Sequence, residues 1–374
     1  MTKFRLLLAF IFVLLAVEIV SAQQYLKIGS ETKLLTKYSA DAVTTDETAR
    51  CLNCHSTRMP KLVETWEKST HAKNGVGCYE CHKAEKGDET ARQGHFSFNV
   101  QLPVSPAKCG FCHQQQYEEF ASSLHATAFD KIKFMPMRES DPELFEASCT
   151  TCHGSLVKLK KGKPVDNSWP NHGIGRVNPD GSLGSCAACH GFHTDSLKVV
   201  RDSSVCKKCH DTDFSPAYTN WSMSMHGSAS DKAIENVDFT RKHLNLTDDP
   251  VMKPNCQTCH MLAPDKKSAS THNVSARISW KFGSLKAEHK EDWGEKRLNM
   301  QKSCRNCHGS TQVEQYYRRL DAAVVATNHL VDKKITADSP FWEKMNLQKT
   351  LMSFRVGFAM LGIVNPLDLE SLLH

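Results

Sequence analysis

The chain has 374 residues, of which 40% are hydrophobic and 24% charged, and its formal net charge at pH 7 is +6. This hydrophobic fraction would give one ordinary core of modest size. Beyond residue 22, no segment is long and apolar enough to cross a bilayer. The sixteen cysteines are the unusual part of the composition, and most of what the sequence implies follows from them.

Residues 1–22 have the features of a secretory signal peptide. Lys3 and Arg5 precede an apolar run, residues 6–17, and small residues at 20–22 provide a cleavage site. The apolar run is short and wrongly flanked for a membrane anchor, which is the alternative. We therefore predict export to the periplasm or an equivalent lumen, and a mature chain that does not span a membrane.

Every cysteine lies in a Cys-x-x-Cys-His motif, and the motif occurs eight times. Two cysteines three residues apart can both form thioether bonds to one porphyrin, and the adjacent histidine then lies under the iron as its proximal ligand. Zinc sites do not require a histidine after every second cysteine, and a disulfide framework would not repeat one motif eight times. The sequence therefore predicts eight c-type haems. The motifs are Cys51, Cys54 and His55; Cys78, Cys81 and His82; Cys109, Cys112 and His113; Cys149, Cys152 and His153; Cys186, Cys189 and His190; Cys206, Cys209 and His210; Cys256, Cys259 and His260; and Cys304, Cys307 and His308.

Eight porphyrins would themselves form most of the core. Helices and loops need only wrap around them, so we expect a mainly α-helical fold with much irregular coil and almost no sheet. Each bis-histidine ferric haem adds about −1, so loss of the signal peptide and binding of eight haems would bring the net charge to about −3. No nucleic-acid partner is expected, and the lysine run at 158–163 reads as a solvated loop.

Six histidines outside the motifs follow them at short, recurring distances, and four of these six lie in a repeated Ser-x-His sequence. Three of the copies end helix-like stretches, at residues 61–71, 114–125 and 217–226. A helix that ends in a rigidly held imidazole can supply the distal ligand of a haem, often not the haem of the preceding motif. The alternative is that these are ordinary surface histidines. The predicted distal ligands are His71, His95, His125, His193, His226 and His272.

The fourth motif breaks this pattern. After His153 the chain enters a loop rich in Lys, Gly and Pro, and the only nearby histidine is His172 in a turn-like context. A haem without a distal ligand has an open coordination site, which is what chemistry at the iron requires. A seventh distal ligand could be His172, His243, His289 or none of them.

The sequence pattern changes after the eighth motif, from haem-attachment motifs to long helical stretches. Residues 312–331 have the pattern of an amphipathic helix, Asp338-Ser339-Pro340 is a break, and residues 341–363 favour a second helix. We expect a helical hairpin that covers the haem core, with a possible role in oligomer contact. The predicted organisation is a signal peptide at 1–22, an octahaem cytochrome domain at 23–310 and a C-terminal helical region at 311–374.

The order of these features resembles the hydroxylamine oxidoreductase family of octahaem cytochromes, over residues 51–317. The most specific stretch is Gly-Arg-Val-Asn-Pro-Asp-Gly-Ser at 175–182, which leads into the fifth motif, and the segments at 258–261 and 271–275 add to it. The resemblance implies that the fourth haem is five-coordinate and binds a small nitrogen substrate. It also implies that the other haems relay electrons to a small cytochrome or other redox partner, and that the chain forms a homo-oligomer, commonly a trimer.

The sequence departs from this family in three places. The Asp-His proton relay after the sixth motif reads Asp213-Phe214, and phenylalanine cannot move protons; His172 or His243 could substitute. Tyr316 and Tyr317 lie too close to the last motif to match the tyrosine that cross-links the catalytic haem in oxidising members. The chain also ends earlier than expected, either as a shortened member or because a C-terminal part is missing.

Two functions follow. The first is an oxidoreductase that oxidises hydroxylamine, or reduces nitrite or hydroxylamine, at the fourth haem, with His153 and Asp213 as catalytic residues. The second is a non-catalytic electron-transfer protein or subunit in which all eight irons are six-coordinate.

Overall fold

The computed structural model describes residues 36–37, 43–165, 168–169, 171, 173–194, 196–233, 254–265 and 267–361. The predicted signal peptide, His172 and His243 lie outside the described residues. The chain divides into two compact units, one made of residues 1–114, 158–166 and 191–195 and the other of residues 115–157, 167–190 and 196–374. We call them the three-motif unit and the five-motif unit, because they contain motifs one to three and four to eight.

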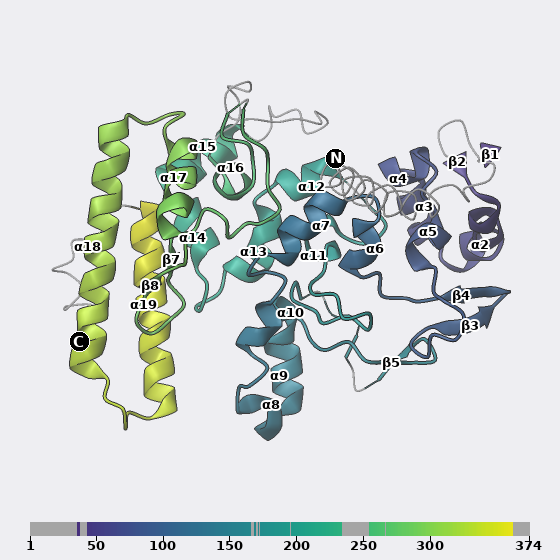
Figure 1. The fold of residues 1–374 in the computed structure, drawn as a ribbon, viewed down its shortest axis with the longest axis horizontal. Helices are drawn as coiled ribbons and strands as arrows, with labels where there is room; N and C mark the ends of the chain where they lie inside the picture. Colours follow the sequence, from purple (N-terminus) through teal and green to yellow (C-terminus); the bar gives the residue numbers. More distant parts are fainter. Residues whose placement is uncertain are drawn as a thin grey trace, which may run out of the picture. The chain divides into compact units, whose positions relative to one another are not determined.

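The three-motif unit consists of short helices and three β-hairpins (Figure 1). Thr45 is the N-cap of the unit's longest helix: its side chain accepts a hydrogen bond from the backbone N of Thr48. Two acidic residues in the first turn further stabilise this end of the helix. Leu52, Val63 and Trp66 form its buried apolar cluster with Ala72. The elements are β1 (Thr36–Lys37), β2 (Val43–Thr44), α2 (Asp46–Arg58), α3 (Pro60–Glu67), α4 (Thr70–Lys73), α5 (Cys78–His82), β3 (Arg92–His95), β4 (Phe98–Val100), α6 (Pro106–Gly110), β5 (Leu159–Lys160) and β6 (Lys163–Pro164).

The five-motif unit is mainly helical with much irregular coil, and its motif-bearing helices are mostly only one turn long. Among its described residues there is one hairpin, β7 (Trp280–Lys281) with β8 (Glu288–His289), with two residues in each strand. The helices are α7 (Gln114–Ala121), η1 (Ala128–Lys131), α8 (Met137–Ser140), α9 (Pro142–Ser148), α10 (Thr150–His153), α11 (Ala187–His190), α12 (Leu197–Arg201), α13 (Ser204–His210), α14 (Ala217–Ser222), α15 (Met225–Ala233), α16 (Cys256–His260), α17 (Trp293–Cys304), α18 (Ser310–Lys334) and α19 (Phe341–Leu361).

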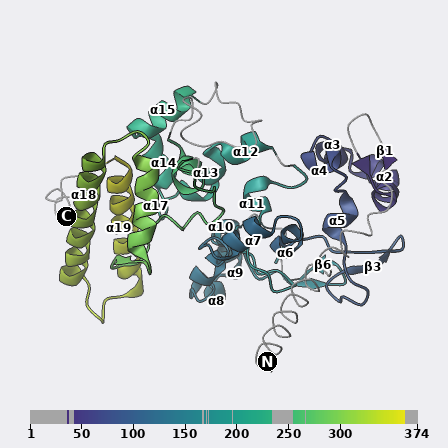
Figure 2. The same cartoon turned by 45° about the horizontal axis from the view of Figure 1, so that its top comes forward.

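The fold class is as predicted: a mainly helical multihaem cytochrome fold with little sheet and a C-terminal helical hairpin. In the described residues the sheet consists only of two-stranded antiparallel ladders and isolated bridges. The α18 and α19 helices run side by side, as Figures 1 and 2 show. Among the described residues, no helix has the length and hydrophobicity that a membrane span requires.

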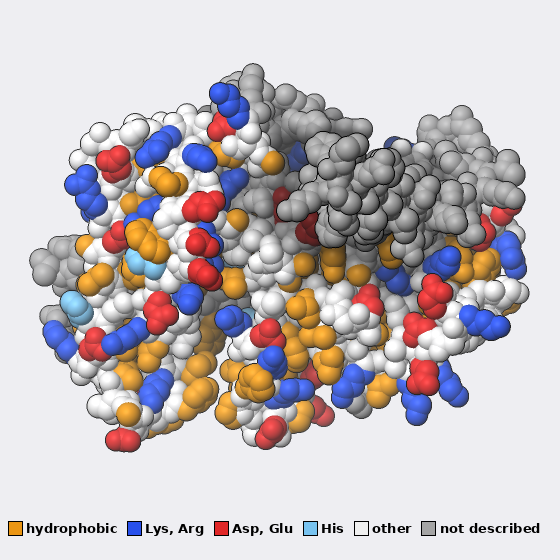
Figure 3. Space-filling view, viewed as in Figure 1, with side chains coloured by type: hydrophobic (Ala, Val, Ile, Leu, Met, Phe, Trp, Pro, Cys, Tyr) orange, Lys and Arg blue, Asp and Glu red, His pale blue; other side chains and the backbone are white. Residues whose placement is uncertain are grey.

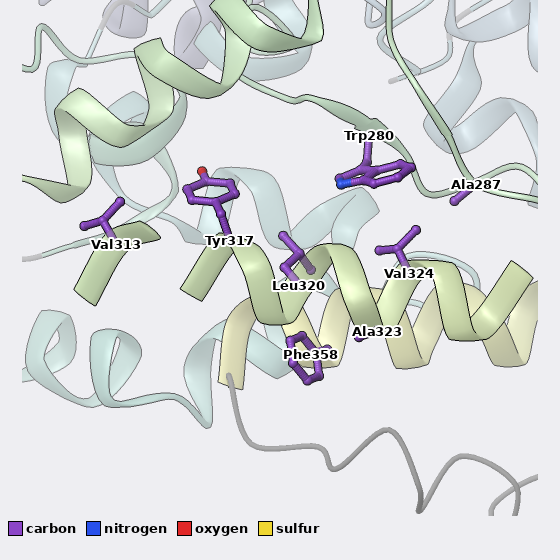
Figure 4. Packing of buried hydrophobic residues seen from close by; sticks show 8 residues of the cluster. All are labelled: Trp280, Ala287, Val313, Tyr317, Leu320, Ala323, Val324 and Phe358. Atoms are coloured by element: carbon purple, nitrogen blue, oxygen red, sulfur yellow. The ribbon is translucent and has the colours of Figure 1, made fainter. Parts of the chain in front are cut away.

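The largest apolar cluster of the five-motif unit is centred on α18. Leu320, Val324 and other α18 side chains pack against Phe358 of α19 and against Trp280 of the β7–β8 hairpin. Figure 4 shows Trp280 and Phe358 on different sides of α18. The Trp280 indole also donates a hydrogen bond to Asp321, 2.9 Å away, so the hairpin is held to α18 by both apolar and polar contacts.

Arg355 is the buried charge that joins α19 to this cluster. Its side chain is 1% exposed, and its guanidinium donates hydrogen bonds to the backbone oxygens of residues 282, 284 and 285. Thr327 and Asn328 of α18 accept two further bonds. Burial lowers the pKa of Arg355 to about 10, so the side chain remains charged at neutral pH. The bonds connect two helices and a loop through one side chain.

Replacing Arg355 with Met should destabilise the holoprotein by on the order of 3 kcal/mol, because several buried acceptors would lose their donor. Urea unfolding followed by near-ultraviolet circular dichroism measures this loss. Arg318→Met is the matched control, since Arg318 lies on α18 with its side chain 76% exposed and should change stability by less than about 0.5 kcal/mol. Equal losses in the two variants would contradict the anchoring role of Arg355.

Candidate functional site

The sixteen cysteines form no disulfides with one another, although all of them lie in the described residues. Each motif spans about one helical turn or lies at a helix end, as in α5, α10 and α16. On a helix, residues three and four positions apart share a face, so two sulfurs and an imidazole point to the same side. This arrangement fits attachment of one porphyrin to each motif.

Six motif histidines face a second imidazole across a nearly constant distance. Metal–imidazole bonds are about 2.0 Å long and the ring centre lies about 1.1 Å beyond the nitrogen, so two axial imidazoles on one iron have centroids about 6.2 Å apart. The six observed centroid separations lie between 5.9 and 6.3 Å. The pairs are His55 with His95, His71 with His113, His82 with His193, His125 with His210, His190 with His272, and His226 with His308.

The member of each pair that lies outside the motifs is one of the six histidines that the sequence singled out. None of them faces the motif that it follows in the chain: His71 follows the first motif and faces the third, and His226 follows the sixth and faces the eighth. Each pair also lies wholly within one unit. His193 reaches the second motif because residues 191–195 belong to the three-motif unit, at a bend where His193 has a φ of 61°.

Several motif histidines also have a hydrogen bond that fixes their orientation. When Nδ1–H donates to an oxygen of the protein, Nε2 carries the lone pair and is left to bind a metal. The fourth motif has this arrangement, because His153 Nδ1 lies 2.9 Å from the backbone oxygen of Ala128. The other examples are His82 with the Gln101 oxygen at 2.8 Å, His210 with Ser215 Oγ at 2.7 Å and His260 with the Val274 oxygen at 3.2 Å.

Burial keeps several of these imidazoles in the neutral form. Desolvation lowers the pKa of His82 and His210 below the usual value, and it lowers the pKa of His125 and His260 to about 4. A neutral imidazole has the lone pair that a metal requires. These side chains are therefore in the ligating form at neutral pH.

The serine of the Ser-x-His sequence has a structural role in three of its four copies. The hydroxyls of Ser69, Ser123 and Ser224 are buried, and each accepts a hydrogen bond from the backbone N three residues later. The preceding helices α3, α7 and α14 end before these serines. The expectation that the helices continue to the histidine was therefore wrong. Instead, the serine caps a new turn, and the histidine lies within it.

The fourth copy is built differently. Ser270 is exposed, and the backbone N of His272 donates to the Glu119 carboxylate at 2.7 Å. Glu119 Oε2 also lies 3.8 Å from His272 Nδ1. Glu119 could not be predicted from the sequence, because it precedes His272 by 153 residues and follows no motif spacing.

His153 and His260 differ from the other motif histidines. Within the described ranges, no second imidazole stands opposite either of them at the 6 Å spacing. His172 and His243, two candidates for a seventh distal ligand, lie outside the described residues. The third candidate, His289, is stacked between Trp280 and Trp293, with centroids 3.6 and 4.1 Å away.

The fourth motif is closely packed against residues 173–177. The backbone N of Ile174 donates to the Cys152 oxygen at 3.0 Å, and Val177 pairs with Leu156. Gly154 has a φ of 79°, and a Cβ there would lie 2.5 Å from the backbone N of Arg176. Only glycine fits this position, because both the backbone angle and the space exclude a side chain. Arg176 lies in the stretch at 175–182 that most resembles the hydroxylamine oxidoreductase family, and its side chain is 1% exposed.

Sulfur contacts show which motifs are neighbours. The Cys152 and Cys209 thiols are within hydrogen-bonding contact, as are those of Cys206 and Cys256. The sixth motif is therefore adjacent to both the fourth and the seventh. Haems held by these three motifs would therefore be attached through neighbouring sulfurs.

The Asp213 carboxylate is exposed and joined to the C-terminal helix. Lys349 Nζ of α19 lies 2.5 Å from Asp213 Oδ2 and 5.7 Å from the centre of the Phe214 ring. In the described residues, no hydrogen bond or ion pair joins Asp213 to His153. Lys349 was not predicted, because nothing in the pattern of α19 distinguishes it from other surface lysines.

The two tyrosines after the last motif belong to the hairpin core. The Tyr316 hydroxyl donates to the backbone oxygen of Ala359 at 2.7 Å, and Tyr317 packs in the cluster centred on α18. Burial raises the pKa of both phenols well above their usual range, so both remain protonated. Their apolar neighbours include Cys304 of the eighth motif.

Comparison with known proteins gives two family matches and similarity to solved structures. The family described as "Seven times multi-haem cytochrome CxxCH" matches residues 73–339, and the family "Cytochrome c554 and c-prime" matches residues 19–83. A solved structure titled "Hypothetical multiheme protein" superposes with a TM-score of 0.71 at 21% identity, covering 90% of this chain and 92% of that one. The reducing HAO-like protein complex of Kuenenia stuttgartiensis contains a chain that matches with a TM-score of 0.57 at 18% identity, covering 86% and 72%. At sequence identities this low, the structural similarity shows a common fold alone.

Replacing His226 with Ala should convert the haem of the eighth motif from low-spin to high-spin, because its iron would lose one of two axial imidazoles. Electron paramagnetic resonance of the oxidised protein measures the change, with haem content measured in parallel. His329→Ala removes an exposed histidine from α18 and should leave the spectrum unchanged. An unaltered spectrum in the His226 variant would show that this pair does not ligate one iron.

Proposed function

Because the chain belongs to the multi-haem cytochrome family, whose match spans residues 73–339, we propose that it reduces small nitrogen compounds at the haem of the fourth motif. The substrates would be nitrite or hydroxylamine. One observation carries the proposal: six motif histidines have an imidazole opposite them, whereas His153, like His260, has none among the described residues. The resemblance to the hydroxylamine oxidoreductase family assigns the chemistry to the fourth motif rather than to the seventh. A haem held on one face only can bind a substrate on the other.

The protein residues at this site have separable roles. His153 would bind the iron through Nε2, and its Nδ1–H bond to the Ala128 oxygen would keep the imidazole in one orientation. The tight packing of residues 173–177 holds the fourth motif in place. A haem bound here would supply an iron that can bind the nitrogen compound and pass it electrons delivered by a donor. The sixth motif, next to the fourth through Cys209 and Cys152, would provide the route by which electrons arrive.

Four observations favour reduction over hydroxylamine oxidation. Phe214 stands where the resembled family has a proton-accepting histidine, and Lys349 places a cation against Asp213. Reduction of nitrite to ammonium consumes protons, and an ammonium group is a proton donor, whereas oxidation needs an acceptor. Tyr316 and Tyr317 are both buried in the hairpin core, which gives no support for a cross-link to the fourth haem. One similar structure is titled a reducing HAO-like complex.

The second candidate function is a non-catalytic electron conduit. It is favoured by the solvent exposure of Asp213, whose side chain is 76% exposed and paired with a surface lysine. In that case the fourth and seventh irons would obtain distal ligands from residues such as His172 and His243, and all eight would be six-coordinate. We further propose export through the signal peptide at 1–22, exchange of electrons with a small cytochrome, and assembly into a homo-oligomer, as the family resemblance implies.

Addition of NO or cyanide to the purified holoprotein should perturb one haem and leave the bis-histidine haems unchanged, because only an open iron binds a ligand without displacing an imidazole. Ultraviolet–visible and paramagnetic resonance titrations give the number of sites. Haem analysis should give eight haems per chain. A protein that binds neither ligand, with a wholly low-spin spectrum, is the conduit and not the enzyme.

Asp213→Asn should lower the rate of nitrite or hydroxylamine reduction with a reduced viologen dye by about 10²-fold, because the site would lose a group that handles protons. Asp332→Asn is the matched control, since Asp332 is also exposed and paired with a lysine, Lys286, but lies on α18. An Asp213→Asn variant with unchanged activity over the pH range 6–9 would exclude a catalytic role for this carboxylate.

A further inference from the structure

The tip of the β3–β4 hairpin exposes an aromatic side chain beside a distal histidine. Phe96 is 74% exposed, and both Phe96 and Ser97 have positive φ values, 48° and 76°. The preceding residue, His95, has its imidazole 5.1 Å from the Phe96 ring and 6.3 Å from that of His55. The hairpin tip therefore presents an accessible aromatic ring directly beside the His95 imidazole.

Basic side chains surround this tip. Arg50 Nη2 donates to the Phe96 backbone oxygen at 3.3 Å, and its guanidinium lies 4.6 Å from the centre of the Phe98 ring. Arg92, at the start of β3, is exposed and lies on the same strand as His95. The haem ligand at this tip therefore lies in a positive environment.

The lysine-rich β5–β6 hairpin is held next to β3. The backbone N of Lys161 donates to the Glu89 oxygen at 2.9 Å, and that of Gly162 to the Thr90 oxygen at 3.2 Å. A Cβ on Gly162 would lie 2.7 Å from Arg92. The sequence suggested a solvated loop here, but residues 158–166 belong to the three-motif unit and are docked beside the strand that carries His95. The exposed lysines are Lys158, Lys160, Lys161 and Lys163.

Together these residues form one basic surface, which we call the His95 surface: Phe96, Arg50, Arg92 and the four lysines of the β5–β6 hairpin. Exposed acids nearby are Glu85 and Glu89, so positive charge prevails. Figure 3 shows Lys and Arg side chains gathered along the lower edge, in the region of β3 and β5. After loss of the signal peptide and binding of eight haems, the net charge of the protein would be about −3, so this basic surface would belong to a weakly negative molecule.

We propose that the His95 surface docks an acidic redox protein of the small cytochrome type and passes electrons between it and the haem held by His55 and His95. Charge complementarity would steer the partner, and the Phe96 ring would supply the apolar contact at the centre of a basic rim. In each encounter one electron moves: the partner's ferrous iron is oxidised to ferric, and the ferric iron between His55 and His95 becomes ferrous. No proton or group is transferred. The inference rests on the electron-transfer role and not on chemistry at the fourth motif.

Stopped-flow reduction by an acidic monohaem cytochrome c and by a strongly basic one tests the proposal. In Lys160→Glu/Lys163→Glu, the second-order rate constant with the acidic cytochrome should fall at least about tenfold at low ionic strength. The difference should diminish near 0.5 M salt, where charges are screened within about 4–5 Å. The rate with the basic cytochrome should stay equal or rise. Phe96→Ala should slow the acidic cytochrome at both salt concentrations.

The control is Lys281→Glu/Lys286→Glu, which reverses two exposed lysines of the five-motif unit. Haem content and reduction by dithionite, a small reductant that needs no docking, should be equal in all variants. An unchanged rate with the acidic cytochrome, or an equal fall in the control, would overturn the proposal. The result is independent of whether the fourth haem binds NO, so failure here and failure of the proposed enzymatic function are distinguishable.

Discussion

The arrangement of this protein depends on one constraint: an iron that binds two imidazoles fixes them about 6 Å apart, whatever their separation in the sequence. Six pairs in the structure satisfy that spacing, and every one connects a motif to a histidine that follows a different motif. His193 and His82, for example, are separated by more than a hundred residues. Ligation of one iron by two distant histidines would hold the chain together. In other proteins a large apolar core or a sheet has this role, so the helices here can be short.

The motifs, and the six histidines that the structure places opposite motif histidines, could be singled out from the sequence because both follow from local chemistry. Their role as distal ligands stays a prediction. Thioether attachment requires a fixed spacing, and Ser-x-His is a local capping arrangement at Ser69, Ser123 and Ser224. The two long C-terminal helices were also predictable, because each has a long, continuous helical pattern ended by a break. Which histidine faces which motif could not be predicted, since the pairing depends on the tertiary fold.

The features that sequence reasoning missed all depend on contacts between distant segments. Lys349 meets Asp213 only because α19 packs against α14, and Glu119 meets His272 across 153 residues. The lysine run at 158–163 reads as an ordinary loop until its hairpin is seen beside β3. Its placement makes these lysines part of a defined surface beside His95.

The central claim is that six irons are each held between two named imidazoles while the iron of the fourth motif has a different environment. Anomalous diffraction at the iron absorption edge, from crystals of the haem-loaded protein, tests it most directly. The account predicts an iron peak midway between the rings of each of the six pairs, and an iron at His153 without a protein ligand on its other face. An imidazole bound opposite His153, or an iron displaced from any of the six pairs, would contradict it.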